Sequence, residues 1–193
     1  MVAFVIYING WPGVGKLTVA TALQPLIPGS QILHNHELID PVENIYPRRS
    51  PYYHEKREEY RRYRLKPIAE DPKVRDTVFI FTDSQTDHND CMSDYTDLGR
   101  GEHARRFYTV ILECEQAENE RRLVMSGRGN GVNGKLVDVD VLRKCRAGES
   151  SHIFEDTDEI VIDVTHIRAE EAAELISDFV ARREVEGRCA DDF

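Results

Sequence analysis

Runs of apolar residues alternate with amphipathic stretches along the chain. Five short runs rich in β-branched and aromatic residues have the pattern of strands that are buried on both faces. They cover residues 3–8, 31–33, 77–82, 107–112 and 160–163. Amphipathic or strongly charged stretches predict helices at 16–23, 52–69, 115–125, 138–147 and 169–183.

The alternation of strands with helices predicts an α/β fold in which helices cover both faces of a parallel sheet, giving three layers. Residues 40–51 contain three prolines and are predicted to be loop, whereas 84–101 is polar with room for a helix in its middle. The chain of 193 residues suits a single domain over 1–184, with a small mobile lid at about 126–137. Residues 185–193 are expected to form a tail that is frayed from Glu184 onward.

A glycine-rich segment between the first predicted strand and helix is the strongest functional signal. It reads Gly10-Trp-Pro-Gly-Val-Gly-Lys-Leu-Thr18. Glycines let the backbone wrap closely around phosphate oxygens, and the wrapped N–H groups bind anions at the positive end of the following helix. The lysine adds a positive charge for the β- and γ-phosphates. We therefore predict that a nucleoside triphosphate is held by Gly10, Pro12, Gly13, Val14, Gly15, Lys16, Leu17 and Thr18, with Lys16 also catalytic.

Leu17 departs from the usual phosphate-loop pattern, in which Ser or Thr directly after the lysine binds Mg²⁺. Thr18 follows one residue later and is either a weak metal ligand or a contact of the α-phosphate. Two alternatives stay open. Either Mg²⁺ is held through water molecules and carboxylates, or metal-dependent chemistry is weakened.

The run Ile8-Asn-Gly10, followed by Pro-Gly-Val-Gly-Lys-Leu-Thr-Val-Ala, resembles a group of P-loop kinase-like proteins, often labelled AAA-type ATPases. That group is similar in layout to adenylate, shikimate and gluconate kinases. The resemblance covers roughly residues 3–180 and includes Asn35-His36 and the run 133–138. It implies a five-stranded sheet of order 2-3-1-4-5, a mobile lid after the fourth strand, and ATP as phosphoryl donor. Leucine often follows the lysine in that group, so Leu17 looks like a family trait.

The predicted loop after the second strand, residues 34–40, is the candidate acceptor side, because ligands of open α/β sheets bind beyond the carboxyl ends of the strands. Shikimate kinase-like proteins usually carry acidic residues near positions 34 and 36, where this chain has His34 and His36. A histidine accepts a hydroxyl proton near neutral pH, so His36 is the candidate base. Asn35, His36 and Asp40 are the candidate acceptor contacts in this segment.

The predicted helix from residue 52 places Arg57 and Arg61 near one stripe. Guanidinium groups bind carboxylates or phosphates in a bidentate manner, which makes both arginines candidate acceptor anchors. The alternative is a solvated helix on which Glu58 pairs with Arg62.

Asp83 ends the third predicted strand. A carboxylate at this place holds the water shell of Mg²⁺ in related folds, so Asp83 is the candidate catalytic and metal-binding residue. The alternative is an aspartate that caps a turn, and Asp87 is a weaker candidate for the metal role.

Basic residues lie on both sides of the predicted lid. The run 120–128 resembles the lid entrance of adenylate kinase-like enzymes, where arginines close over the transferring phosphoryl group. Guanidinium groups stabilise the charge that spreads over the phosphoryl oxygens. Arg121 and Arg128 are therefore candidate catalytic residues, and Lys135 is a further cation for the phosphates. The alternative is a surface loop with incidental charges.

The composition of the chain argues against some classes of function. The net charge of -10 argues against a general nucleic-acid or membrane-surface binder. The four cysteines match no zinc pattern, and free thiols are typical of a cytoplasmic protein. We expect a kinase that uses ATP and Mg²⁺ to phosphorylate a small-molecule acceptor, as a monomer or homodimer. The alternative is a nucleotide-binding regulatory protein or slow ATPase without a metabolite acceptor.

Overall fold

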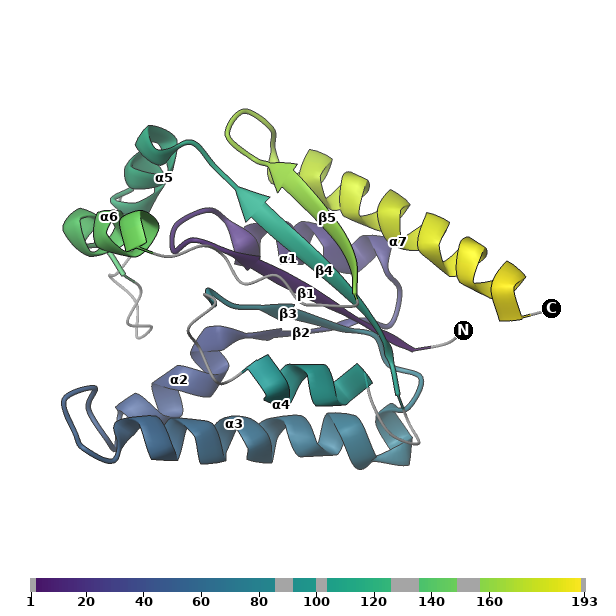
Figure 1. Cartoon of the computed structure of the whole chain (residues 1–193), viewed down its shortest axis with the longest axis horizontal. Helices are drawn as coiled ribbons and strands as arrows, with labels where there is room; N and C mark the ends of the chain where they lie inside the picture. The colour runs from purple at the N-terminus through teal and green to yellow at the C-terminus, as the bar shows by residue number, and fades with distance from the viewer. Residues whose placement is uncertain (1–2, 86–91, 100–103, 126–135, 149–156, 192–193) are drawn as a thin grey trace.

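A computed structural model describes residues 3–85, 92–99, 104–125, 136–148 and 157–191. Within these ranges the strands form one five-stranded parallel sheet of order β2-β3-β1-β4-β5 (Figure 1). The strands are β1 (Phe4–Gly10), β2 (Gln31–His34), β3 (Phe79–Thr82), β4 (Arg106–Glu113) and β5 (Asp158–Asp163). The predicted α/β class and strand order are confirmed.

The central strand β1 organises the core because it is buried along its whole length. Successive side chains of a strand point to opposite faces, so β1 supplies both cores. Ile6 and Ile8 belong to one hydrophobic cluster, and Val5 and Tyr7 belong to the other. These two clusters explain why the first apolar run does not alternate with polar residues.

The helices form a layer on each face of the sheet (Figure 1). One layer holds α1 (Lys16–Leu23) and α7 (Ala169–Asp191), and the other holds α2 (Asn35–Glu43), α3 (Tyr53–Glu70) and α4 (Met92–Thr96). The remaining helices, α5 (Gln116–Leu123) and α6 (Val139–Gly148), follow β4 and lie near the carboxyl ends of the strands. Single turns of 3₁₀-helix cover Gln24–Leu26, Pro72–Val74 and Asp97–Gly99.

Two expectations from the sequence are wrong. Most of the predicted loop at 34–40 and the start of the predicted loop at 40–51 are helical, because α2 runs from Asn35 through Pro41 to Glu43. Leu38, Ile39 and Val42 lie on its buried side, and this burial outweighs the cost of a proline inside a helix.

The second error concerns the C-terminal segment, because α7 continues as far as Asp191. Glu184, the expected start of the frayed tail, is buried and accepts a hydrogen bond of 2.6 Å from the Tyr108 hydroxyl. Burial makes the largest contribution to raising the pKa of the Tyr108 hydroxyl, and this hydrogen bond raises that pKa further. The contact fixes this part of α7 to the central sheet.

Residues 126–135 of the predicted lid lie outside the described residues, and Arg128 and Lys135 lie there with them. Asp87 also lies outside the described residues. None of the helices in the described ranges has the length and apolar character needed to cross a bilayer.

Candidate functional site

The segment between β1 and α1, which we call the phosphate loop (Gly10–Thr18), follows the carboxyl end of the central strand. Gly10 and Gly13 have φ angles of +148° and +92°. A Cβ atom on Gly10 would lie 2.5 Å from the carbonyl oxygen of Leu112, and one on Gly13 would lie 3.0 Å from Nδ2 of Asn119. The loop therefore requires glycine at both positions, because its backbone lies directly against β4 and α5.

The carbonyl groups of the loop are hydrogen-bonded by three side chains, one from α1 and two from α5. Nζ of Lys16 donates to the carbonyl oxygens of Gly10 and Trp11, at 2.6 and 3.0 Å. From α5, Nδ2 of Asn119 donates to the carbonyl oxygen of Pro12 at 3.0 Å. Arg122 Nη1 donates to the carbonyl oxygen of Val14 at 3.1 Å.

These carbonyl contacts leave the start of α1 well suited to an anion. The first N–H groups of a helix have no partner within the helix, and the helix dipole makes this end positive. Gly15 is the N-cap of α1, and no side chain of the described residues caps the helix. Leu17 is half-buried and offers no oxygen, whereas Thr18 is exposed.

The ends of β1 and β3 are held together by Asn9, which is fully buried. Its Oδ1 accepts from the N–H groups of Gly10 and Gln85, each at 2.9 Å, and its Nδ2 donates to the Gln85 carbonyl at 3.0 Å. This amide fixes the start of the phosphate loop relative to the residues that follow β3.

Asp83, the candidate metal residue, lies directly after β3 and is 2% exposed. Its carboxylate accepts from the Ser84 N–H at 2.7 Å, from Nε2 of Gln85 at 2.5 Å and from the Tyr95 hydroxyl at 3.2 Å. The neighbouring Ser84 hydroxyl accepts from Nζ of Lys16 at 2.7 Å. The structure therefore brings the segment that follows Asp83 against the phosphate loop.

A cavity of about 270 Å³ opens beside the phosphate loop, between α5 and the turn from β5 to α7. Arg122 forms part of its wall and donates Nη2 to the carbonyl oxygens of Val164 and Thr165, at 2.8 and 3.0 Å. The lining residues are Val14, Gly15, Thr18, Val19, Glu118, Arg121, Arg122, Met125, Val164, Ile167, Arg168 and Ala169.

Arg121, a candidate catalytic residue, lies at the rim of this cavity and is bound to a carboxylate. Its Nε and Nη2 donate to Glu118, at 2.6 and 2.7 Å, and its side chain is 61% exposed. Hydrogen bonds from Arg121 and then Arg122 lower the pKa of Glu118 to about 2. Glu118 is therefore ionised at neutral pH and holds the two guanidinium groups in place.

The candidate acceptor contacts come from α2 and α3. Nδ1 of His36 lies 3.2 Å from Oδ1 of Asp40, one helical turn away on α2. Arg57 reaches from α3 and donates Nη2 to Oδ1 of Asn35 at 3.4 Å. Asn35, His36, Asp40 and Arg57 are all partly exposed, and the structure brings them together as two pairs, His36 with Asp40 and Arg57 with Asn35.

Arg61 has a different environment. It is 7% exposed, and its Nε and Nη2 lie 2.7 and 2.6 Å from Oδ2 of Asp94. Asp94 belongs to α4 and also pairs with Arg62 on the surface of α3. Arg61 therefore joins α3 to α4 in this structure.

Three side chains of the phosphate-loop region were not singled out from the sequence as site residues: Asn9, Asn119 and Arg122. Asn119 and Arg122 are three residues apart on α5, a spacing that puts them on one face of a helix. No local pattern states which helix lies behind the loop, because that depends on the packing of α5 against residues more than a hundred positions earlier.

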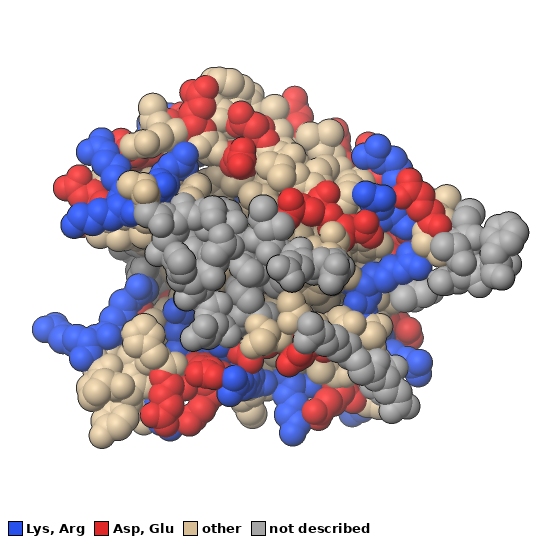
Figure 2. Space-filling model, viewed as in Figure 1, with Lys and Arg blue, Asp and Glu red and all other residues tan. Residues whose placement is uncertain are grey.

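The space-filling view shows a hollow on the left of the molecule, between the end that carries α5 and α6 and the end that carries α2 and α3 (Figure 2). Lys and Arg side chains gather on both margins of this hollow, with acidic side chains among them. Positive groups on both sides suit an anionic ligand between the margins.

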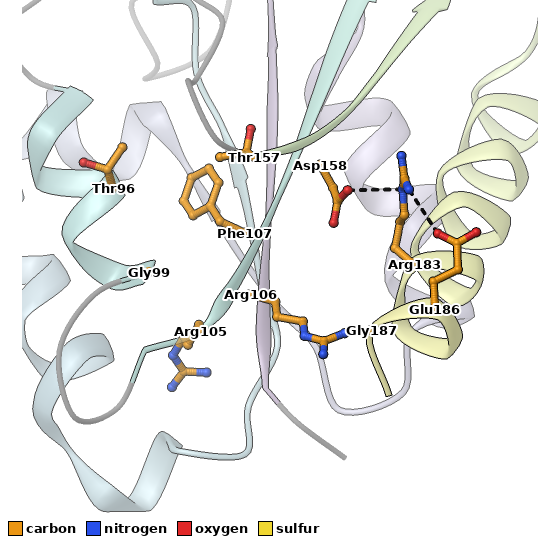
Figure 3. A pocket seen from close by; sticks show the side chains of 10 residues that line it. All are labelled: Thr96, Gly99, Arg105, Arg106, Phe107, Thr157, Asp158, Arg183, Glu186 and Gly187. Atoms are coloured by element: carbon orange, nitrogen blue, oxygen red, sulfur yellow. Dashed lines mark hydrogen bonds and ion pairs between the residues drawn. The ribbon is translucent and has the colours of Figure 1, made fainter. Parts of the chain in front are cut away.

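A second cavity, of about 560 Å³, lies at the opposite end of the strands, near the starts of β4 and β5 (Figure 3). Its arginines already have partners. Arg183 pairs with Asp158 and Glu186, at 3.2 and 3.0 Å, and Arg106 lies 3.6 Å from Glu184. This balance of charge gives no preference for an anion, so we assign no site there.

No family model and no curated protein matches the chain. Its fold is similar to that of solved kinases. A sugar kinase from Janibacter sp. HTCC2649 has a TM-score of 0.65 at 19% identity, over 93% of this chain and 95% of that one. A gluconokinase from Sinorhizobium meliloti 1021 has a TM-score of 0.62 at 16% identity, over 94% and 93%.

The APS kinase of Mycobacterium tuberculosis, solved with AMPPNP and APS, has a TM-score of 0.60 at 15% identity, over 93% of this chain and 98% of that one. These similarities extend over nearly the whole length of each chain. They show that this chain has the P-loop kinase-like fold.

Proposed function

We propose that the protein binds ATP at the phosphate loop and transfers its γ-phosphoryl group to a small-molecule acceptor. The observation that supports this most directly is the shape of the loop. Two glycines are required by their positive φ angles and close contacts, and four carbonyl groups are bound by side chains. A lysine lies at the start of a helix that none of the described side chains caps. Such a loop presents N–H groups and positive charge to a polyphosphate.

The phosphates would be held by the loop backbone from Gly10 to Thr18 and by Lys16. Lys16 would exchange its hydrogen bonds to loop carbonyls and Ser84 for contacts with phosphate oxygens, which are stronger because both partners are charged. The purine would lie in the cavity between α5 and the turn that follows β5, whose walls are largely apolar at Val14, Ile167 and Ala169.

The residues that would hold Mg²⁺ fit a metal bound through water. Leu17 offers no ligand atom, and both oxygens of Asp83 already accept hydrogen bonds. Asp83 would therefore bind the water shell of the metal, with Thr18 as a weaker second contact. Bound Mg²⁺ would neutralise charge on the phosphate oxygens.

The acceptor would bind against α2 and α3, with Asn35, Asp40 and Arg57 as contacts. Asp40 lies close enough to hold the Nδ1–H of His36, which would leave Nε2 of His36 to take the proton of the attacking hydroxyl. The acceptor oxygen would form the new bond to phosphorus as the bond to the ADP oxygen breaks. Arg121, and Arg128 and Lys135 from outside the described residues, would stabilise charge on the transferring group. We leave Arg61 out of the proposal because Asp94 binds it.

A screen of metabolites for stimulated ADP formation tests this function. A kinase shows a rate of ADP release that rises sharply with one hydroxyl-bearing compound, with the phosphorylated product detected by mass spectrometry. Calorimetry with ATP and Mg²⁺ provides the binding step independently. Absence of ATP binding would contradict the whole proposal.

The absence of a hydroxyl at Leu17 favours a second candidate, a nucleotide-binding regulatory protein or slow ATPase. The same assays separate the candidates. A slow ATPase gives one low rate of ADP release with every compound in the panel, and a regulator binds ATP without turnover.

A further inference from the structure

Asn119 of α5 has no solvent exposure and contacts the phosphate loop. Its Nδ2 donates to the Pro12 carbonyl at 3.0 Å, and its Oδ1 accepts from Nη1 of Arg146 at 3.1 Å. These two bonds fix the orientation of the amide, because the donor side faces the loop and the acceptor side faces Arg146.

Arg146 belongs to α6 and contacts three separate parts of the molecule. Besides Asn119, its Nη2 donates to the carbonyl oxygen of Cys114 at 3.1 Å, at the end of β4. Its guanidinium carbon lies 5.7 Å from the centroid of the Trp11 ring, within the range of a cation–π contact. One guanidinium group therefore joins β4, α5 and the phosphate loop.

Because the peptide bond is planar, these contacts also set the direction of N–H groups in the loop. In a trans peptide unit the carbonyl group of one residue and the N–H group of the next lie in one plane and point in opposite directions. The described chain has no cis peptide bond. A side chain that holds the Pro12 carbonyl therefore also sets the direction of the Gly13 N–H, and Arg122 sets the Gly15 N–H through Val14 in the same way.

We propose that Asn119 and Arg146 are positioning residues for the polyphosphate: Asn119 aims the Gly13 N–H by holding the Pro12 carbonyl, and Arg146 locks the Asn119 amide in that orientation. This inference rests on the proposed nucleotide site. It extends the binding apparatus to α6, a helix that lies outside the loop and follows the segment 126–135 in the chain.

The residue types fit this role. Asparagine has a donor on one side of its amide and an acceptor on the other, and both are used. Aspartate has the same shape but only acceptor oxygens when ionised, so it cannot donate to the Pro12 carbonyl. Asn119→Asp therefore removes the positioning bond with almost no change in volume.

Arg143 provides a matched control on the same helix. Its Nε and Nη2 donate to Glu120 on α5, at 2.8 and 2.7 Å, and its side chain is 53% exposed. Arg143→Ala and Arg146→Ala each remove one connection between α6 and α5. Of the two, Arg146 has the contacts with Asn119 and Trp11.

The experiment measures the dissociation constant of ATP with Mg²⁺ by calorimetry, together with Trp11 emission and urea unfolding. Trp11 is the only tryptophan, so its emission reports the loop directly. We expect Asn119→Asp to weaken ATP binding roughly tenfold and Arg146→Ala about threefold to tenfold, since one positioning hydrogen bond is lost in each. Arg143→Ala should leave ATP binding unchanged. Trp11 emission without nucleotide should shift in Arg146→Ala and not in Arg143→Ala.

Equal ATP affinity in Arg146→Ala and Arg143→Ala would overturn the inference. So would a loss of unfolding free energy in Arg146→Ala with ATP affinity unchanged, since that result describes a packing residue. If Arg146→Ala does not fold, Arg146→Lys serves instead. It keeps the charge but cannot span both Asn119 and the Cys114 carbonyl, so wild-type ATP affinity in that variant also overturns the inference. Failure of the wild-type protein to bind ATP removes the proposed function itself and is seen before any variant is made.

Discussion

The nucleotide half and the acceptor half of the candidate site use polar side chains in different ways. In the nucleotide half, Lys16, Asn119, Arg122 and Arg146 all donate to backbone carbonyl groups or to an amide that holds one. In the acceptor half, polar side chains bind one another, as in His36 with Asp40, Arg57 with Asn35, and Arg64 with Glu37.

This difference indicates that the nucleotide half needs less rearrangement than the acceptor half to bind a ligand. Side chains bound to the backbone fix the path of the chain, so we expect the phosphate loop to have the same shape with and without a nucleotide. Bonds between partly exposed side chains are worth little and are easily exchanged for a ligand. We therefore expect the acceptor half to change partners when it binds, and the nucleotide half to change mainly at Lys16.

The largest expected effect concerns a strongly buried ion pair near the acceptor half, between Arg61 and Asp94. Asp94→Ala removes the Asp94 carboxylate from the Arg61 guanidinium, whose side chain is 8% exposed. Breaking a buried pair in this way costs roughly 3–5 kcal/mol of unfolding free energy. Urea unfolding measures this loss, with Glu58→Ala, which breaks an exposed pair with Arg62, as the control. A loss in Asp94→Ala no larger than in Glu58→Ala would mean that Arg61 is available to a ligand after all.

The next prediction separates the two halves by function. His36→Ala should lower acceptor-dependent turnover at least about a hundredfold, because general-base catalysis contributes that much or more. The dissociation constant of ATP should stay the same, since His36 belongs to α2 and does not contact the phosphate loop in any hydrogen bond described here. Steady-state kinetics and calorimetry measure the two quantities. Normal turnover in this variant would place the base elsewhere.

Lys16→Ala should weaken ATP binding, which His36→Ala should leave unchanged. The lost charge-assisted contact should weaken ATP binding by about 1–3 kcal/mol, while the unfolding free energy changes little because the ammonium group is only partly buried. Calorimetry with ATP measures the loss, and Lys56→Ala, at a partly exposed lysine of α3 that pairs with Glu59, is the control. Equal ATP affinity in Lys16→Ala and the wild type would remove the phosphate loop from the nucleotide site.

The same contrast explains how much could be predicted from the sequence. The phosphate loop is a local pattern, in which glycines with positive φ and a lysine follow a buried strand, and the structure has the predicted strand and α1 at those residues. The parallel sheet likewise follows from apolar runs that alternate with helices. These features depend on neighbours in the chain.

Features that depend on distant residues could not be predicted in this way. Arg57 and Arg61 lie on one helix, as their spacing predicts. Which of them faces Asp94 depends on the packing of α4 against α3. Asn119 looks like an ordinary polar residue of a charged helix until α5 is placed behind the loop. The helix through Pro41 could not be predicted from the prolines of 40–51, because its stability comes from the buried face of α2 and not from local sequence.

The smallest expected effect tests whether the carboxylate of Glu118 organises the arginines beside the nucleotide half. Its pKa in the folded protein is lowered from 4.5 to about 2 by Arg121 and Arg122, so its stabilising effect is full above pH 4.5 and is lost as the pH falls toward 2. Thermal unfolding of Glu118→Gln should therefore lie slightly below that of the wild type at pH 6, and this difference should close between pH 4.5 and about 2. Glu174→Gln, on the exposed face of α7, is the control and should show no such closing. A difference that persists or grows in acid would mean that Glu118 acts through packing instead of charge, and Arg122 would then owe its placement to the backbone carbonyls of Val14, Val164 and Thr165.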